Sequence, residues 1–215
     1  MAASSSPAPA PTPLMSPSGV VAVVGPQFCA PYVVALTVTK KALSLSDGDF
    51  VVSDVNGDVL MKVQGRVLSL HSRRVLCDAA GSPIISMREK KLSMHHRWNV
   101  YRGDSSDQKD LLFTVKKSHM LQLKTELDVF LAANTAEQHC DFKVKGSWFE
   151  RSCTFYLGDT NTIIALMSRQ YELKNVLLGK DTFGVTVYPN VDYAFVVAII
   201  VILDEIHRDR MEHGD

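Results

Sequence analysis

One basic stretch of the chain, residues 62–102, holds the side chains best suited to bind a ligand. It contains nine Lys or Arg residues and only two carboxylates, Asp78 and Glu89, so it carries a net charge of +7, while the 215-residue chain is formally neutral. A guanidinium group binds a phosphate through two parallel hydrogen bonds, and a lysine adds a point charge. The stretch therefore predicts an anionic partner. The candidate contacts are Lys62, Arg66, Arg73, Arg74, Arg88, Lys90, Lys91 and Arg97.

The spacing of these residues predicts that several share one surface. Side chains of an extended segment alternate between two faces, so with Met87 in a core, Arg88 and Lys90 project outward. Preceding predicted strands, which can pair nearby, carry Lys62, Arg66, Arg73 and Arg74. About five basic residues on one face, each contributing about 1 kcal/mol near an anionic lipid surface, recruit a protein weakly to a membrane. The alternative interpretation is a set of basic residues scattered over an exterior and balanced by acids elsewhere.

The residue pattern gives little support for metal binding, catalysis or nucleic-acid binding. The oxygen-rich stretch 54–58 places its glycine too early for an EF-hand and lacks the final glutamate, so we interpret it as a hairpin turn. His95 and His96 point to opposite faces of an extended chain and do not bind one ion together. The sequence has no nucleophile elbow, P-loop or dinucleotide-binding glycine motif, and no clear nucleic-acid signature. We expect no enzyme activity, no cofactor and no metal ion.

The element that must position these residues lies near the end of the chain. Every residue from Tyr193 to Leu203 is apolar. A helix that is apolar on all sides must be enclosed by protein or by lipid. This run spans about 16 Å as a helix, whereas a bilayer core needs about 30 Å. The sequence therefore predicts a buried helix at about residues 191–207, with Asp192 as its N-cap.

About a dozen β-rich runs precede this helix, most of them separated by turn residues. Two sheets packed about 10 Å apart leave no room for such a helix, whereas a wide closed barrel does. The predicted fold is mainly β, a closed antiparallel barrel around a central hydrophobic C-terminal α-helix. The predicted strands are Val20–Val24, Tyr32–Thr39, Phe50–Ser53, Val59–Val63, Val67–His71, Arg73–Cys77, Pro83–Met87, Trp98–Tyr101, Leu111–Val115, Leu121–Leu131, Phe142–Val144, Cys153–Leu157, Ile163–Met167 and Phe183–Val187.

Composition limits the organisation of the chain. Residues 1–19 are rich in Ala, Ser, Pro and Thr and predict a disordered tail, followed by a single domain at 20–210. The 46% hydrophobic content is ordinary for a soluble protein. Four cysteines without a C-x-x-C pair, and no secretory signal, indicate reduced thiols. We expect a monomer in the cytoplasm, at the plasma membrane as a peripheral protein, or in the nucleus.

The sequence resembles the plant LURP-one-related family from about Val20 to Arg210. The stretches that carry the resemblance are Phe28–Tyr32, Gln64–Asp78, Gly81–Pro83, Met87–Lys90, Leu92–Trp98, Cys140–Trp148, Tyr188–Phe195 and Val201–Glu205. The family is similar to the C-terminal domain of tubby proteins and to phospholipid scramblases. The resemblance therefore implies a twelve-stranded barrel around a central hydrophobic helix. The family has no established enzymatic activity, and some of its members are linked to pathogen defence in plants.

Three functional hypotheses remain open from the sequence. The first is a non-catalytic binding module that docks on anionic membrane lipid, because tubby domains bind phosphoinositides and the basic stretch suits phosphate. The resemblance does not assign the lipid-binding residues of tubby domains to particular positions of this sequence. The second is a scaffold for protein partners or a nuclear regulator. The third is a scramblase-like membrane protein whose terminal helix inserts into lipid, which the length of the apolar run disfavours.

Overall fold

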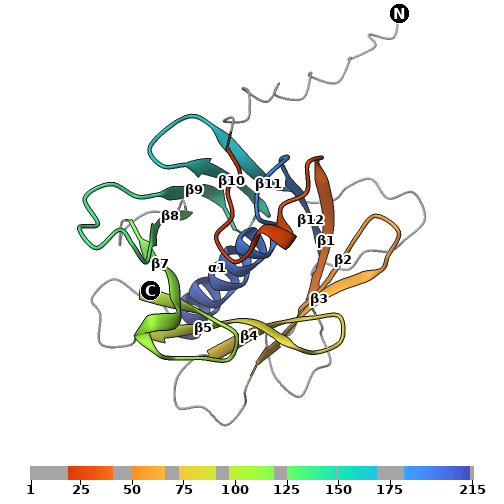
Figure 1. Ribbon diagram of the computed structural model, residues 1–215, viewed down its shortest axis with the longest axis horizontal. Coiled ribbons are helices and arrows are strands. Elements are labelled where there is room, and N and C mark those ends of the chain that lie inside the picture. The colour runs from red at the N-terminus through yellow and green to blue at the C-terminus, as the bar shows by residue number, and fades with distance from the viewer. Residues whose placement is uncertain are drawn as a thin grey trace, which may run out of the picture.

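Twelve antiparallel strands close into a barrel within the part of the chain that the structure, a computed structural model, describes: residues 19–40, 50–65, 73–90, 97–118, 125–148, 150–168 and 182–213. Each strand pairs with its neighbours in sequence, and β12 pairs with β1 to close the ring (Figure 1). The strands are β1 (Val34–Lys40), β2 (Phe50–Ser53), β3 (Val59–Gly65), β4 (Arg73–Asp78), β5 (Pro83–Lys90), β6 (Arg97–Arg102), β7 (Leu111–Lys117), β8 (Thr125–Leu131), β9 (Phe142–Ser147), β10 (Ser152–Leu157), β11 (Ile163–Ser168) and β12 (Thr182–Val187). One long helix, α1 (Tyr193–His213), follows β12. The predicted architecture is confirmed.

Most of the predicted strands are confirmed with small shifts at their ends, but Val20–Val24 is wrong. In the described part of the chain this segment makes only one isolated bridge, between Val21 and Val191. The backbone N–H groups of Val23 and Val24 donate to a side-chain carboxylate instead of a neighbouring strand. Residues 1–18 of the predicted tail, the predicted strand Val67–His71 and residues 121–124 lie outside the described residues.

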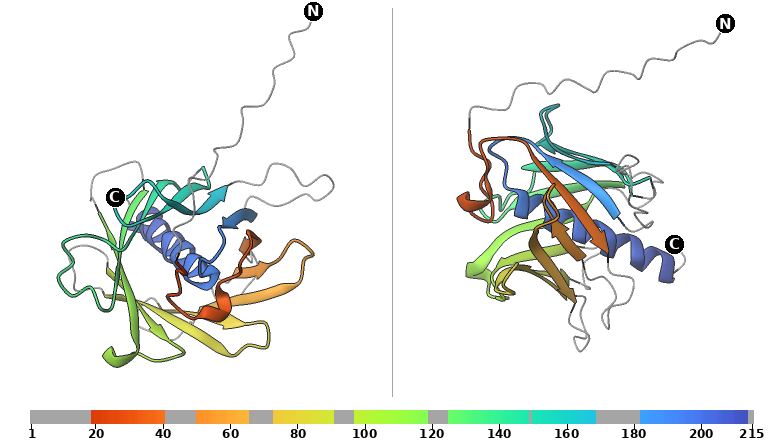
Figure 2. Two further views of the ribbon diagram at one scale, coloured as in Figure 1. Left: turned by 45° about the horizontal axis from the view of Figure 1, so that its top comes forward. Right: turned by 90° about the vertical axis from the view of Figure 1, so that its right-hand side faces the viewer.

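Helix α1 runs along the barrel axis, from the end that carries the segment before β1 to the opposite end (Figure 2). Every residue from Ala194 to Leu203 is completely buried. The ring of Phe195 packs against Phe113 and Phe142, with 5.0 Å and 4.7 Å between ring centroids. The helix continues past the predicted end because no Gly or Pro interrupts it before Gly214. Within the described residues, no helix is long and apolar enough to cross a membrane.

The start of α1 is fixed by the carboxylate of Asp192, which is completely buried. Its Oδ1 accepts a hydrogen bond from the backbone N–H of Phe195 at 3.0 Å, which confirms the predicted N-cap. Its Oδ2 accepts three more backbone N–H groups, from Val24 at 2.7 Å, Gly25 at 3.0 Å and Val23 at 3.1 Å. One side chain thus joins the segment before the first strand to the helix after the last strand.

Gly146 in β9 permits a close approach of two strands. A Cβ atom added at this residue would lie 2.1 Å from the carbonyl oxygen of Ser152 and 2.7 Å from the Cα of Cys153. Both are backbone atoms, of residues in β10 that pair with Ser147 and Gly146, so they cannot move aside as a flexible side chain would. The pairing of β9 with β10 therefore requires glycine here.

The four hydrogen bonds of Asp192 predict a large loss of stability in Asp192→Ala. Each buried N–H group left without an acceptor costs about 1–3 kcal/mol, so we expect the free energy of unfolding to fall by about 4 kcal/mol. Urea denaturation followed by circular dichroism measures it.

Asp54→Ala is the matched control. Asp54 Oδ1 also accepts two backbone N–H groups, from Asn56 and Asp58, but in an exposed hairpin turn where water replaces the lost acceptor. We expect the free energy of unfolding to fall far less in Asp54→Ala than in Asp192→Ala. Equal losses in the two variants would show that the Asp192 carboxylate does not fasten the N-terminal segment to the helix.

Candidate functional site

The eight basic candidates do not all share one face of the barrel. Two of them, Arg66 and Lys91, lie outside the described residues. Arg74 points into the barrel, because it is 7% exposed and pairs with a residue of α1. The others lie on strands β3 to β6 with outward-facing side chains, and they are Lys62, Arg73, Arg88, Lys90 and Arg97.

Arg74 holds a buried carboxylate of the helix. Its Nε lies 2.7 Å from Oε1 of Glu205, whose side chain is completely buried. Arg208 contacts the other oxygen of Glu205 at 2.5 Å. Burial raises the pKa of Glu205, and the positive charges of Arg74 and Arg208 oppose that increase. Arg74 therefore links α1 to β4, and it does not belong to an exterior lipid-binding face.

Two further polar links join the C-terminal half of α1 to the barrel wall. Lys40 of β1 reaches Asp204 at 2.9 Å. His207 contacts the carbonyl of Leu203 through Nδ1 at 2.8 Å and the hydroxyl of Thr125 through Nε2 at 3.1 Å. Since a carbonyl only accepts, we assign the proton to Nδ1, which leaves Nε2 to accept from Thr125. The run Asp204-Glu205-Ile206-His207, directly after the apolar residues, is the sequence signal that could have identified these links.

The outward-facing surface of strands β3 to β6, here called the outer wall, carries two arginines directly opposite each other. Arg73 in β4 pairs with Arg88 in β5 across the antiparallel ladder. Arg73 forms an ion pair with Asp104 and donates to the backbone carbonyl of the same residue at 3.2 Å. Met87 is completely buried, which confirms that the half-buried Arg88 faces outward. The Nε of Arg88 is buried and, among the described residues, has no hydrogen-bond partner.

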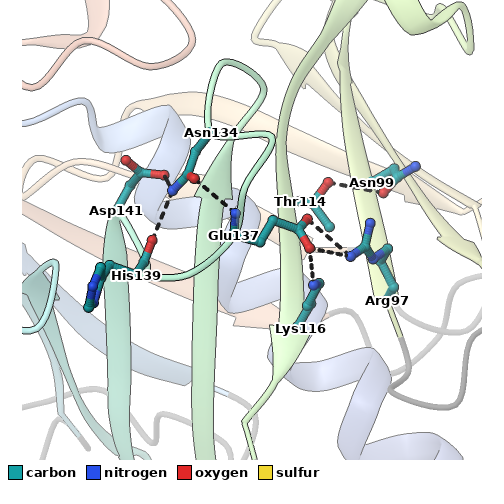
Figure 3. Close-up of polar contacts among 8 residues, drawn as sticks. All are labelled: Arg97, Asn99, Thr114, Lys116, Asn134, Glu137, His139 and Asp141. Atoms are coloured by element: carbon teal, nitrogen blue, oxygen red, sulfur yellow. Dashed lines mark hydrogen bonds and ion pairs between the residues drawn. The ribbon is translucent and has the colours of Figure 1, made fainter.

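A second acidic contact covers the neighbouring part of the wall (Figure 3). Glu137, in the loop between β8 and β9, accepts hydrogen bonds from Nη2 of Arg97 at 3.0 Å and 2.8 Å. Its Oε2 also contacts Nζ of Lys116, on β7. The pKa of Glu137 is lowered because the effects of Lys116 and Arg97 together outweigh the larger single effect of burial, which acts in the opposite direction. Lys116 was not among the predicted residues.

The wall is therefore only partly neutralised. Arg73 and Arg97 each have a carboxylate from a loop, as the interpretation of balanced charges requires. Lys62 donates to the backbone carbonyl of Ala79 at 3.1 Å, which is a neutral acceptor. Lys90 is exposed at the end of β5, opposite Arg97 in the ladder. Arg88 and Lys90 thus share the outer face of β5, whereas Lys62 pairs with Cys77 at the other end of β4 from Arg73.

The cysteines and the acidic turns offer no activated group in the described residues. All four cysteines are free thiols. Burial raises the pKa of Cys153 to about 12 and that of Cys29 to about 11, so these thiols are protonated and weakly nucleophilic at neutral pH. No group of three His, Cys, Asp or Glu in the described part of the chain is arranged to hold a metal ion. His95 and His96, whose adjacent positions argue against joint binding of one ion, lie outside it.

The buried pair predicts a pH-dependent loss of stability in Arg74→Ala. Removing one partner of a buried ion pair costs about 3 kcal/mol, and Arg208 limits the loss here. Without Arg74 the pKa of Glu205 rises further. A carboxyl group whose pKa is raised by folding stabilises the folded state at low pH and loses that effect as the pH rises through the folded pKa. The difference from wild type, measured by urea denaturation, should therefore be larger at about pH 7.5 than at about pH 5.

The double variant Arg74→Gln with Glu205→Gln is the control for this prediction. It removes the isolated buried charge, so it should recover most of the stability and abolish the pH dependence of the difference. A loss in Arg74→Ala that is independent of pH would contradict the assignment of Glu205 as the stranded group.

Comparison with known proteins places the chain in a family. The family model described as LURP-one-related matches residues 34–204, which include all twelve strands and most of the buried part of α1. Similar proteins of Arabidopsis thaliana include Protein LURP-one-related 15, 55% identical over 95% of this chain and 93% of its own length. Protein LURP1 is 46% identical over 86% of this chain and 90% of its own length.

A solved structure is similar as well. An X-ray structure of a protein from Arabidopsis thaliana has 47% sequence identity and a TM-score of 0.70, and the match covers 88% of this chain and 99% of the other. Neither the family description nor the names of these relatives states an enzymatic activity. With the family model spanning the barrel and relatives of high identity along its length, the chain belongs to the LURP-one-related family.

Proposed function

We propose that this protein is a non-catalytic binding module that docks peripherally on anionic membrane lipid through the outer wall of β3 to β6. The observation that carries the proposal is Arg88. Its guanidinium group faces outward beside Arg73, and its buried Nε has no hydrogen-bond partner among the described residues. An unsatisfied buried donor is costly, and like charges directly opposite in a ladder repel each other. An anionic group bound to the outer nitrogens of this guanidinium group would offset the repulsion between the two arginines.

A phosphate-bearing lipid fits this arrangement better than a carboxylate. A guanidinium group binds two phosphate oxygens at once, and Lys90, two residues along β5 on the same outer face as Arg88, adds charge without a fixed direction. Phosphoinositide headgroups concentrate several negative charges at one point of the membrane surface. We therefore propose a phosphoinositide as the lipid. The basic candidates Arg66 and Lys91, outside the described residues, belong to the same proposal.

The place of this docking in plant defence rests on the family alone. The family resemblance links some members to pathogen defence, and the chain shares 46% identity with Protein LURP1. We propose that lipid docking brings the barrel to the membrane during such signalling.

A scaffold for protein partners is the second candidate, and one observation favours it. The segment before β1 exposes large apolar side chains, with Val20 at 61%, Tyr32 at 67% and Val33 at 50% exposure. This segment is anchored by Asp192, so these side chains are presented from a fixed backbone. Apolar contacts with a protein partner would be insensitive to salt, whereas docking on anionic lipid weakens as salt is added.

Sedimentation with phosphatidylcholine vesicles, with and without phosphoinositide, tests the lipid proposal. Wild type should bind only the phosphoinositide vesicles, and less at higher salt. Arg88→Glu should weaken binding at least about fivefold, and the double variant with Lys90→Glu should weaken it further, because each basic residue contributes about 1 kcal/mol near anionic lipid and reversal adds repulsion.

Lys145→Glu is the matched control. It makes the same charge reversal on β9, four strands away from β5, where the lysine side chain is 55% exposed and its nearest carboxylate oxygen, on Glu126, lies 3.9 Å away. It should bind like wild type, apart from a small effect of net charge. Equal loss in Lys145→Glu and Arg88→Glu would reject a specific face. No binding by any of these proteins would reject the lipid function and direct attention to the exposed apolar segment.

A further inference from the structure

We infer that Glu137 occupies a second phosphate-binding site, formed by Arg97 and Lys116, and that its carboxylate keeps this site closed to lipid. The inference rests on the proposed function, because it extends the lipid-binding wall from β3–β6 to β7 and adds its regulation. The ligand is the phosphomonoester group of a phosphoinositide headgroup at a membrane surface.

The two cations converge on one anion. Arg97 on β6 and Lys116 on β7 reach the same carboxylate from adjacent strands, and their side chains remain 27% and 22% exposed. Both oxygens of Glu137 accept from Nη2 of Arg97, and Oε2 also meets Nζ of Lys116. A phosphate group presents the same kind of paired acceptor oxygens to a guanidinium group, with more negative charge. The carboxylate therefore stands where a phosphate could bind.

The site is built into the wall, independently of the loop that covers it. Nζ of Lys116 lies 4.9 Å from the centre of the Phe130 ring, which holds the ammonium group in position from β8. Beside the two cations, the hydroxyl of Thr114 donates to Oδ1 of Asn99 at 3.2 Å. These contacts come from β6, β7 and β8, so they persist when Glu137 moves away.

The loop has a firm base, and the backbone N–H of Glu137 at its tip donates to Oδ1 of Asn134 at 3.1 Å. At the base, Asn134 donates to the carboxylate of Asp141 and to the carbonyl of His139, at 2.8 Å and 2.9 Å (Figure 3). At the tip, residues 135, 136 and 138 are exposed, and only Glu137 turns back to the wall. It does so with a φ of 49°, a left-handed conformation that non-glycine residues rarely adopt. Contact with the barrel therefore depends on one side chain.

Displacing that side chain changes the charge of the wall. With Glu137 in place, Arg97, Lys116 and the carboxylate sum to one positive charge. Without it the pair carries two, and Lys90 lies directly opposite Arg97 in the ladder. Three basic side chains would then lie in one row across β5, β6 and β7, next to Arg88, and the row ends at Asp128 of β8, which lies opposite Lys116 in the ladder. A membrane rich in phosphoinositide would compete with Glu137 for this row, whereas a weakly charged membrane would not.

Glu137→Gln tests the inference, with Glu150→Gln as its control. Both substitutions raise the net charge by one, but Glu150 is exposed in the turn between β9 and β10, away from the row. In sedimentation with vesicles containing phosphoinositide, Glu137→Gln should bind about fivefold more tightly for each basic residue uncovered, with a steeper dependence on salt. Adding Arg97→Gln and Lys116→Gln to Glu137→Gln should remove that gain. Unchanged thermal unfolding of Glu137→Gln establishes that the barrel is intact.

The outcomes separate this inference from the proposed function. If wild type binds and Glu137→Gln binds no better than Glu150→Gln, the covered site is rejected while lipid docking stands. If wild type binds weakly and Glu137→Gln binds strongly, both are supported. If neither binds, both are rejected. An equal gain on vesicles whose charge is matched with phosphatidylserine would reject a phosphomonoester site in favour of simple surface charge.

Discussion

The carboxylate of Asp192 is the interaction on which the rest of this barrel depends. It accepts four backbone N–H groups, one from the first turn of α1 and three from the segment before β1. Because β12 ends just before Asp192 and β1 begins just after that segment, the same residue lies where the first and last strands close the ring. Closure of the barrel, capping of the helix and anchoring of the N-terminal segment are thus coupled through one buried charge. The charge is tolerated because it is fully hydrogen-bonded.

The two halves of helix α1 contact the barrel in different ways. Its first turns are apolar and fill a lumen that strand side chains alone would leave open. Its later turns are tied to the wall by Lys40 with Asp204, and by Arg74 with Glu205. The apolar contacts of the first turns have no fixed direction, whereas an ion pair or a hydrogen bond requires one partner at one position. Buried ion pairs add little net stability, but they have specific partners. We interpret them as fixing the register of the helix against β1 and β4.

The sequence predicted the barrel because its signals are local. Alternation identifies strands, glycine and asparagine mark the hairpins, and an apolar run too short for a bilayer requires enclosure. The strand predicted at Val20–Val24 is wrong. Its β-branched residues favour a strand, but its backbone N–H groups donate to a carboxylate far along the chain. The predicted exterior position of Arg74 is wrong for a similar reason. Charge suggested an exterior position, but alternation with the outward Arg73 puts it inside, where Glu205 compensates its burial. Tertiary contacts between distant residues decided both cases.

The same distinction explains why a count of charges could not define the surface. Summed along the chain, residues 62–102 are strongly basic, yet Arg73 meets Asp104 and Arg97 meets Glu137 across the fold. Both acids lie in connections between strands, and they fold back over the outer face of the strands they approach. The strands fix where the positive groups stand, and the loops determine how many are neutralised. A substitution of one loop residue can therefore change the charge of this wall without altering the barrel.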